Sequence, residues 1–396
     1  MWVAILGSAL GLSVAGIIYL ISRFRRFGIV HAIAGERVWL QRLIALIPIT
    51  VIVVFGVFET VNTVIVVLHL ALFWLFADIV TAIAGRVIKR GKNTGTDPKT
   101  DAGTVPEAGS DTAEGKPFKV YWKGIIVILV CAVYLGFGWY NAHHVDRTAY
   151  ELSTEKSLPG GKLRIAQIAD SHIGTTFDGE GFASYMQTIQ KDNPDIVVVT
   201  GDFVDDSSTK EDMVAACRAL GAMQTTYGVY FVYGNHDKGY YNSRDYTPEE
   251  LDAELRNNGV IVMEDKVAVI ADCVCIIGRR DRNEGERKNG TKRLTMDEIT
   301  KELDKSCYTI VLDHQPNDYD AEAAAGADLV LSGHTHGGQL IPLGPIGRWI
   351  GANDRTYGME QRGGTTFIVT SGISDWEIYF KTGTKSEYVI IDITEK

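Results

Sequence analysis

Uncharged apolar runs dominate the first 140 residues of the chain. A helix needs about 20 apolar residues to cross a bilayer, because it advances only about 1.5 Å per residue. The shortest runs would also suit a buried core helix, but their recurrence favours membrane spans. The pattern predicts a transmembrane region, residues 1–140, with about four helices, at 2–22, 40–58, 61–84 and 121–140.

The positions of the cations predict how these helices are oriented. Five arginines lie between residues 23 and 42 and four cations between 86 and 92, whereas Glu59 is the only charge between the second and third runs. Cytoplasmic loops carry the excess of Lys and Arg. With both cationic segments inside, the chain leaves the fourth helix on the outer face. We therefore expect a multi-pass protein of the cell membrane whose residues 141–396 are extracytoplasmic.

Between the third and fourth helices, residues 91–119 are rich in Gly, Thr, Pro and Asp and nearly free of large apolar side chains. Such a segment cannot bury enough apolar surface to offset the entropy of ordering, so a flexible cytoplasmic loop is predicted. Within the membrane region, His69 and Asp78 are functional candidates because ionisable groups are rare there. Hydrogen bonding between helices is their favoured role.

From residue 160 onward the pattern changes to short β-branched runs that alternate with helical stretches. Continuous apolar strands of this kind are typical of sheets that are covered on both faces. The chain is therefore predicted to form an α/β layered domain at 162–396, joined to the membrane region by a linker at 141–161. The predicted strands are 163–169, 195–200, 229–233, 274–277, 308–312, 328–332, 366–370 and 388–393.

Polar side chains follow five of these strands directly. In open α/β sheets, ligands bind beyond the carboxyl ends of the strands, so we expect these side chains to converge. Carboxylate and amide oxygens together with imidazoles suit Mn, Fe or Zn rather than calcium, which takes oxygen ligands only. A single loop histidine such as His314 would more often be an ordinary loop residue, but the joint placement favours a metal site. The side chains are Asp170, His172, Asp202, Asn235, His236, Asp237, His314, His334 and His336.

The charge of the chain is divided unevenly. Residues 1–140 carry 13 cations and 8 anions, a net charge of +5, and residues 141–396 carry 26 and 41, a net charge of −15, which sum to the −10 of the chain. Proteins that bind nucleic acids do so through clustered Lys and Arg. The acidic second part therefore argues against a nucleic-acid partner and favours a small molecule or a lipid.

The sequence blocks DSH, GD, GNHD, a later His and GHTHGG resemble the signature blocks of the calcineurin-like metallophosphoesterase superfamily. The apolar runs before the domain, GHTHGGQ and the downstream YG and TFIVTSGIS resemble the bacterial membrane-associated YkuE-like branch. The resemblance covers roughly residues 162–394. It implies a four-layer α/β/β/α domain that follows an α-helical transmembrane region.

The resemblance also implies the roles of the site residues. One of two divalent ions would be held by Asp170, His172 and His336, and the other by Asn235, His314 and His334, with Asp202 bridging them. His236 would contact the phosphoryl oxygen or protonate the leaving oxygen, and Asp237 would orient that imidazole. Attack on phosphorus would come from metal-bound hydroxide, without a covalent enzyme intermediate.

The sequence therefore predicts a membrane-anchored, two-metal hydrolase of a phosphomonoester, phosphodiester or pyrophosphate, with lipid-linked esters among the candidate substrates. A metal-binding sensor or scaffold on the same fold, a nuclease, and a transporter regulated by the domain are the alternatives.

Several further residues have open interpretations. Asp205 and Asp206 favour a solvated turn or a helix N-terminus, with an outer role at the site as the lesser alternative. Arg279 and Arg280 would bind substrate phosphate or form a surface ion pair. Four aromatic residues, Tyr240, Tyr241, Trp349 and Tyr357, suit either a lipid or sugar pocket or simple packing, and residues 348–353 would approach the membrane.

Overall fold

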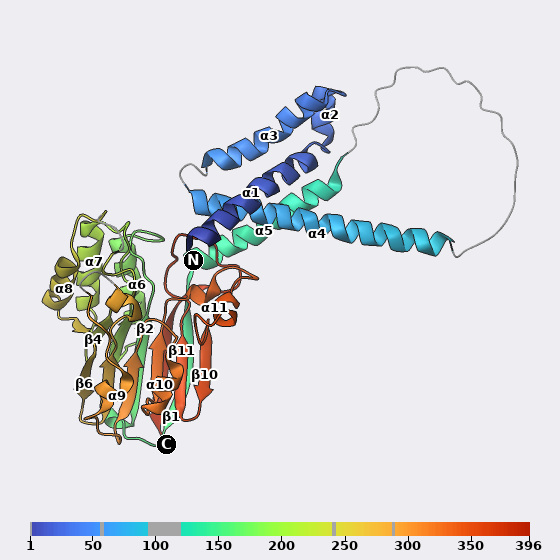
Figure 1. Ribbon diagram of the computed structural model, residues 1–396. Helices are drawn as coiled ribbons and strands as arrows, with labels where there is room; N and C mark the ends of the chain where they lie inside the picture. Colours follow the sequence, from blue (N-terminus) through green and yellow to red (C-terminus); the bar gives the residue numbers. More distant parts are fainter. Residues whose placement is uncertain (1, 56–58, 94–119, 240–242, 287–289) are drawn as a thin grey trace, which may run out of the picture. The chain divides into compact units, whose positions relative to one another are not determined.

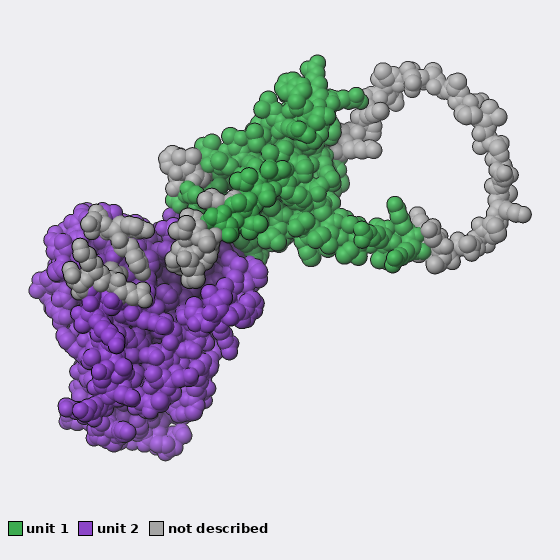
Figure 2. Space-filling view, viewed as in Figure 1, with its two compact units in different colours: residues 1–135 green, residues 136–396 purple. Residues whose placement is uncertain are grey.

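The computed structural model describes residues 2–55, 59–93, 120–239, 243–286 and 290–396. The chain divides into two compact units, unit 1 (residues 1–135) and unit 2 (residues 136–396), which Figure 2 colours separately. Helix α5 belongs to both units, because it begins in the first and ends in the second.

Unit 1 consists of helices, and a helix lies at each of the four predicted ranges (Figure 1). Two helical segments, Thr60–Arg90 and Trp122–His143, are long and apolar enough to cross a membrane, and the apolar segments Gly11–Phe24 and Val38–Val54 are shorter. Residues 56–58 of the predicted second span and 94–119 of the predicted loop lie outside the described residues. The helices are α1 (Trp2–Phe24), α2 (Gly28–Ala34), α3 (Val38–Phe55), α4 (Thr60–Asn93) and α5 (Trp122–His143).

Asp78 joins three helices of unit 1. Its carboxylate accepts a hydrogen bond from the Tyr19 hydroxyl at 2.7 Å and pairs with Arg23 at 2.7 Å and Lys123 at 2.5 Å. The predicted interhelical role of Asp78 is therefore confirmed. The Nδ1 atom of His69 instead lies 2.8 Å from the carbonyl oxygen of Ile65, in its own helix.

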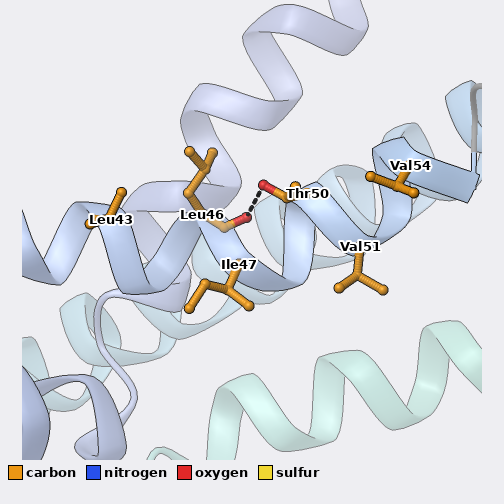
Figure 3. Close-up of a pocket in the computed structure, with 6 residues that line it drawn as sticks. All are labelled: Leu43, Leu46, Ile47, Thr50, Val51 and Val54. Carbon is orange, nitrogen blue, oxygen red and sulfur yellow. Dashed lines mark hydrogen bonds between the residues drawn. The ribbon is translucent and has the colours of Figure 1, made fainter.

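An apolar hollow runs along α3 (Figure 3) and is lined by Leu43, Leu46, Ile47, Thr50, Val51 and Val54. Its only polar side chain, Thr50, donates its hydroxyl proton to the Leu46 carbonyl oxygen at 3.0 Å. The hollow therefore offers no group for acid–base or metal chemistry. Its lining is what a helix presents to lipid tails or to another apolar helix.

Two six-stranded sheets form the frame of unit 2, in the orders β1-β12-β2-β3-β4-β5 and β10-β11-β9-β8-β7-β6. Strands β2 to β5 run parallel, as do β7, β8, β9 and β11, so each sheet gathers several carboxyl ends at one edge. The strands are β1 (Val145–Thr154), β2 (Lys162–Ile168), β3 (Ile196–Thr200), β4 (Val229–Val232), β5 (Ile261–Met263), β6 (Lys266–Ile270), β7 (Val274–Gly278), β8 (Tyr308–Leu312), β9 (Leu329–Ser332), β10 (Gly358–Arg362), β11 (Thr365–Val369) and β12 (Ser386–Glu395).

The buried side chains explain why the sheets stack. Ile165 and Val198 of the first sheet pack in one cluster with Ile310 and Leu331 of the second, because alternate residues of each strand point to the same face. The opposite faces are covered by helices, with Phe182 of α6 among the core on one side and Met296 of α9 on the other. This arrangement is the predicted four-layer α/β/β/α fold.

The helices that cover the sheets have capping signals in the sequence. Thr247 accepts the N–H of Glu250 at 3.2 Å, and the Glu250 carboxylate accepts the N–H of Thr247 at 2.8 Å, a capping box. The helices of unit 2 after α5 are α6 (Gly179–Gln190), α7 (Lys210–Gly221), α8 (Pro248–Asn257), α9 (Met296–Thr300), α10 (Tyr319–Ala324) and α11 (Ile346–Trp349), with short 3₁₀ turns at Pro159–Gly161, Arg282–Glu286 and His336–Gly338.

Residues 141–161 are not the linker that the sequence predicted. Within them β1 pairs in parallel with β12 along the whole length of both strands, from Val145 opposite Ser386 to Thr154 opposite Glu395. The strand was missed because it is an edge strand with half-exposed side chains, so it lacks a continuous apolar run. Unit 2 accordingly begins at residue 136 rather than 162.

Replacing Thr247 by Ala is expected to lower the free energy of unfolding of unit 2 by about 1 kcal/mol, because the substitution removes the capping box of α8. The measurement is urea unfolding of the full chain in detergent micelles. Thr247→Ser is the matched control, since its hydroxyl can still accept the N–H of Glu250. Equal stability of the Ala and Ser variants would show that the cap adds nothing.

Candidate metal centre

The predicted ligands stand at the carboxyl ends of five strands that come from both sheets. Asp170 and His172 follow β2, Asp202 follows β3, Asn235 follows β4, His314 follows β8, and His334 and His336 follow β9. Five of them have positive φ angles: 52° at Asp170, 36° at His172, 51° at Asp202, 72° at His334 and 47° at His336. A positive φ angle raises the conformational free energy of any residue other than glycine. It persists where the surrounding structure enforces it, commonly at functional sites.

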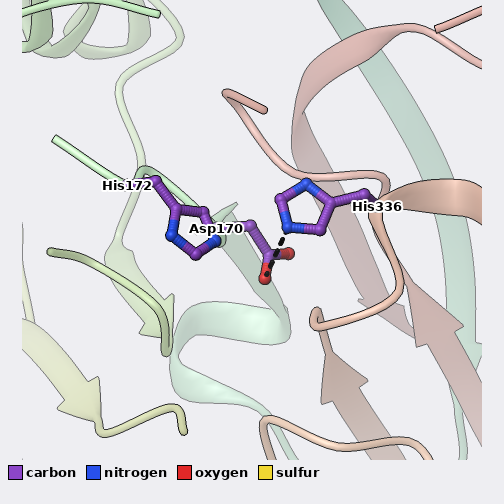
Figure 4. A group of neighbouring side chains, drawn as sticks. All are labelled: Asp170, His172 and His336. Carbon is purple, nitrogen blue, oxygen red and sulfur yellow. Dashed lines mark ion pairs between the residues drawn. The ribbon is translucent and has the colours of Figure 1, made fainter. Parts of the chain in front are cut away.

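One donor group consists of Asp170, His172 and His336 (Figure 4), whose potential ligand atoms all lie within 4.8 Å of one another. His336 Nε2 lies 4.0 Å from Asp170 Oδ1, and the rings of His172 and His336 are 5.1 Å apart between centroids. The backbone N–H of His334 donates to both oxygens of Asp170, at 2.9 and 3.0 Å. This bond holds the carboxylate against the next loop.

A second donor group consists of Asp202, His314 and His334, with Asn235 beside it. Nδ1 of His314 lies 2.8 Å from the carbonyl oxygen of Thr200, so it carries the proton and donates. Nε2 then faces Asp202 Oδ2 at 3.1 Å and Asn235 Oδ1 at 3.2 Å. The lone pair of His314 Nε2 and the oxygens of Asp202 and Asn235 therefore point toward one another, as the ligands of one cation would.

Asp202 lies between the two groups. Its Oδ2 atom is 3.8 Å from His172 Nε2 and 3.1 Å from His314 Nε2. His172 Nε2 is buried without a hydrogen-bond partner among the described residues, while its Nδ1 is held at 3.0 Å by Asp205. A buried ring nitrogen of this kind fits a metal ligand whose tautomer is fixed from the other side. The residues present therefore fit two ions with a common carboxylate.

The electrostatics of the site suit cations. Burial lowers the pKa of His334 to about 3, so the imidazole is neutral and keeps a lone pair. Burial, with a further contribution from Asp202, raises the pKa of Asp170 to about 6. A bound divalent ion would stabilise the ionised form of carboxylates that are buried close together.

Glycines let the strand-end loops approach one another. A Cβ atom at Gly201, where φ is 85°, would lie 2.5 Å from Nδ1 of His314. A Cβ atom at Gly333 would lie 2.6 Å from Oδ2 of Asp170. These two positions therefore require glycine, because any side chain would displace a ligand.

Asp205 is the functional residue that the sequence interpretation did not select. Its two oxygens lie 3.0 Å from Nδ1 of His172 and 3.0 Å from Nδ1 of His236, and the residue is buried. Burial acts in the opposite direction, but the hydrogen bonds with these imidazoles hold the pKa of Asp205 well below its usual range. Asp202 and Asp205 in turn outweigh burial and raise the pKa of His236. One carboxylate thus orients a predicted ligand and the predicted catalytic histidine.

The Asp237 carboxylate, the predicted partner of His236, is engaged by the backbone. It accepts four backbone N–H groups, from Asp202, Phe203, Val204 and Gly234, at 2.7–3.0 Å, while Nδ1 of His236 lies 3.0 Å from Asp205. Asp237 therefore shapes the two loops that carry Asp202 and Asn235. Burial raises its pKa to about 6.

Arg279 has neither of the predicted roles, whereas the partly exposed Arg280 forms an ion pair, which was one of the two alternatives. Arg279 is buried, and its guanidinium pairs with Asp313 at 3.2 Å, Asp318 at 2.7 Å and Glu322 at 3.4 Å. Arg280 pairs with Glu264 at 3.0 Å. The buried network holds the residue that precedes His314, so it supports a ligand position instead of offering a free cation to substrate.

An aromatic ring outside the predicted set borders the site. Trp376 lies beside His236, with 5.2 Å between ring centroids. The Tyr357 hydroxyl donates to Glu387 at 2.9 Å, Trp349 is exposed by 75 %, and Tyr240 and Tyr241 lie outside the described residues. Trp376 is therefore a described aromatic side chain that lies against the predicted catalytic histidine.

The α/β/β/α layers and the paired donor groups at their shared edge are the features expected of a dinuclear phosphoesterase. A family model described as Calcineurin-like phosphoesterase matches residues 163–338. An uncharacterized metallophosphoesterase of Aquifex aeolicus (strain VF5) is 32% identical over 249 residues, which cover 62% of this chain and 91% of that protein. The chain belongs to the calcineurin-like metallophosphoesterase family, which uses a dinuclear metal site, and it is a metal-dependent phosphoester hydrolase.

Two further relatives extend the comparison. The uncharacterized metallophosphoesterase YkuE of Bacillus subtilis (strain 168) is 26% identical over 268 residues, 65% of this chain and 89% of that protein, which supports the YkuE-like branch. A transmembrane protein with metallophosphoesterase domain from Danio rerio is 29% identical over 231 residues, 55% of this chain and 51% of that protein.

Proposed function

We propose that this protein is a membrane-anchored, two-metal phosphoesterase that hydrolyses a phosphomonoester, phosphodiester or pyrophosphate carried on a lipid. The observation that supports the two-metal site best is the position of Asp202, whose Oδ2 atom faces His172 and His314, one from each donor group. Mn, Fe and Zn suit the mixed nitrogen and oxygen donors. The acidic charge of residues 141–396 disfavours a nuclease.

Each side chain has a proposed task. Asp170, His172 and His336 hold one ion, Asn235, His314 and His334 hold the other, and Asp202 serves both. Two divalent ions bound there would polarise phosphoryl oxygens and lower the pKa of an attacking water. His236, oriented through Nδ1 by Asp205, contacts the phosphoryl group or delivers a proton to the leaving oxygen through Nε2. Trp376 packs against this imidazole and limits its rotation.

Removal of metal is expected to abolish hydrolysis, because the two ions are proposed to polarise the phosphoryl oxygens and to lower the pKa of the attacking water. The full chain is treated with a chelator, and Mn, Zn, Fe or Mg is then restored singly while a chromogenic phosphomonoester and a phosphodiester are offered. Turnover that returns with at least one metal is the expected result. Undiminished turnover of the metal-free chain, verified by elemental analysis, would contradict the proposal.

The anchoring proposal is supported by the apolar segments Thr60–Arg90 and Trp122–His143 and by the similarity to a transmembrane relative. The excess of Lys and Arg in the segments after the first and third helices favours a position of unit 2 outside the cytoplasm. Protease added to intact cells, with the outer membrane permeabilised where one exists, is therefore expected to digest unit 2. Protection of unit 2 until the cells are lysed would reverse the orientation, and a cytoplasmic marker protein controls for leakage.

A further inference from the structure

Exposed large hydrophobic side chains of unit 2 gather in two segments. In residues 341–350, here called the apolar loop, Ile341, Leu343, Ile346, Trp349 and Ile350 are exposed by 40–75 %. In the last turns of α5, Phe137, Trp139 and Tyr140 are exposed by 51–61 %. In the rest of the described part of unit 2, such side chains are scattered: Ile261, Val267, Val269, Leu294 and Met359.

Backbone contacts join the two segments. The N–H of Ile341 donates to the Thr382 hydroxyl at 3.0 Å, and the N–H of Lys381 donates to the Gly138 carbonyl oxygen at 2.8 Å. The amide of Asn141 donates to the Lys381 carbonyl oxygen at 3.1 Å. Residues 381 and 382 therefore hold the apolar loop beside the end of α5, so that both belong to one surface.

The charge of the apolar loop differs from that of the rest of unit 2. Residues 339–353, which include the apolar loop, contain no Asp or Glu and one cation, the exposed Arg348. They lie within residues 141–396, whose net charge is −15. An acidic domain is repelled by anionic headgroups, whereas this segment is not. Trp and Tyr rings are favoured at the level of the headgroups, where Trp139, Tyr140 and Trp349 would meet them.

We propose that the apolar loop and the last turns of α5 form a membrane-docking surface, which lies in the headgroup region of the bilayer that α5 enters. A lipid bilayer is the proposed binding partner, because this surface includes the end of the apolar segment Trp122–His143, which is long enough to span a membrane. The proposal rests on the membrane anchoring proposed above.

Docking of this surface has a consequence for the metal centre. The ligand His336 precedes Ile341 by only five residues, and Trp376, beside His236, precedes Lys381 by five. Both connections run from the metal centre directly to the docking surface. The site is thereby kept close to the headgroups, where a phosphoester can react while its lipid tail stays in the bilayer.

The test uses the fluorescence of Trp349 in the full chain, reconstituted in vesicles of phosphatidylcholine and phosphatidylglycerol with or without brominated acyl chains. The contribution of Trp349 is the emission of the wild type minus that of Trp349→Phe. Bromine quenches indole only within the bilayer, so most of this contribution is expected to be lost in brominated vesicles. Equal brightness in both kinds of vesicle would overturn the proposal.

A matched control places tryptophan on another exposed apolar position. Val269 of β6 is exposed by 58 %, and Val269→Trp in the Trp349→Phe background is expected to stay bright with brominated lipid. Quenching at position 269 equal to that at 349 would overturn the specific surface.

Hydrolysis of a soluble chromogenic diester, measured in the same vesicles, separates this inference from the proposed function. Active protein with unquenched Trp349 overturns docking alone. Quenched Trp349 without hydrolysis under any metal supports docking and counts against the proposed activity. A chain that does not float with the vesicles refutes both anchoring and docking.

Discussion

Replacing Asp202 by Asn is expected to abolish metal-restored hydrolysis while the chain stays folded. One oxygen of this carboxylate faces both donor groups, at 3.8 Å from His172 Nε2 and 3.1 Å from His314 Nε2. Asn retains the shape and can still accept the N–H of His236, but it removes the negative charge that two cations share. Loss of an outer partner of a metal ligand costs about 10–100-fold, and we expect a larger loss where both ions lose a ligand.

The measurement combines turnover with the number of ions bound per chain. Asp272→Asn is the matched control, because Asp272 is exposed and its φ of 54° suits Asn equally well. Wild-type turnover of the control with none in Asp202→Asn is the expected pair of results. Turnover of Asp202→Asn within about tenfold of the wild type would be inconsistent with a shared ligand.

The convergence of the candidate ligands was predictable because it follows from two simple patterns. Buried parallel strands have continuous apolar sequences. Their carboxyl ends lie at one edge of the sheet, where ligands bind, so a polar residue directly after an apolar run is expected at that edge. His314 shows the limit of this argument, since by itself it is an ordinary loop histidine. Its Nε2 faces Asn235, which is 79 positions away in the sequence, so only the fold brings their ligand atoms together.

Asp205 was not selected because the contact that gives it a role is not local. The loops after β2 and β3 continue side by side, with the N–H of His172 donating to the Asp202 carbonyl oxygen at 3.1 Å and a bridge between Ile173 and Val204. Because of this pairing, the Asp205 carboxylate lies within hydrogen-bonding distance of His172. In the sequence GDFVDD, by contrast, Asp205 is one of several acidic residues in a turn. The spacing of three residues from Asp202 is the only signal, and it is equally typical of a solvated loop.

Asp237 and Arg279 make contacts that their neighbours in the sequence did not indicate, for a related reason. A carboxylate next to a histidine in the sequence need not contact that histidine. In the loop after β3, the backbone N–H groups of Phe203 and Val204 donate to the Asp237 carboxylate and so compete for its oxygens. Two arginines near a phosphate-ester site suggest substrate binding, yet the side chain of Arg279 is 1% exposed and surrounded by three carboxylates. Sequence gives the charge of a side chain but not the direction in which it points.

Asp205→Asn is expected to lower turnover at least about a hundredfold, because this carboxylate orients two imidazoles and each such outer partner is worth about 10–100-fold. An amide can accept one Nδ1–H but presents an N–H to the other ring, so either His172 or His236 loses its tautomer and orientation. Asp206→Asn, the next residue, is the control, since this carboxylate pairs with Arg244 at 3.6 Å. Asp205→Asn with wild-type turnover would mean that the two imidazoles are held by packing alone.

A second variant shows through which imidazole Asp205 acts. His236→Ala removes the proposed proton donor but no metal ligand, so it is expected to lower turnover while the chain still binds two ions. Asp205→Asn is expected to lower turnover and also to weaken metal binding, because it additionally releases His172 from its 3.0 Å contact. Elemental analysis after dialysis, together with turnover at saturating metal, separates these effects. If Asp205→Asn retains both ions as firmly as His236→Ala does, Asp205 serves His236 alone, and the orientation of His172 depends on its buried surroundings.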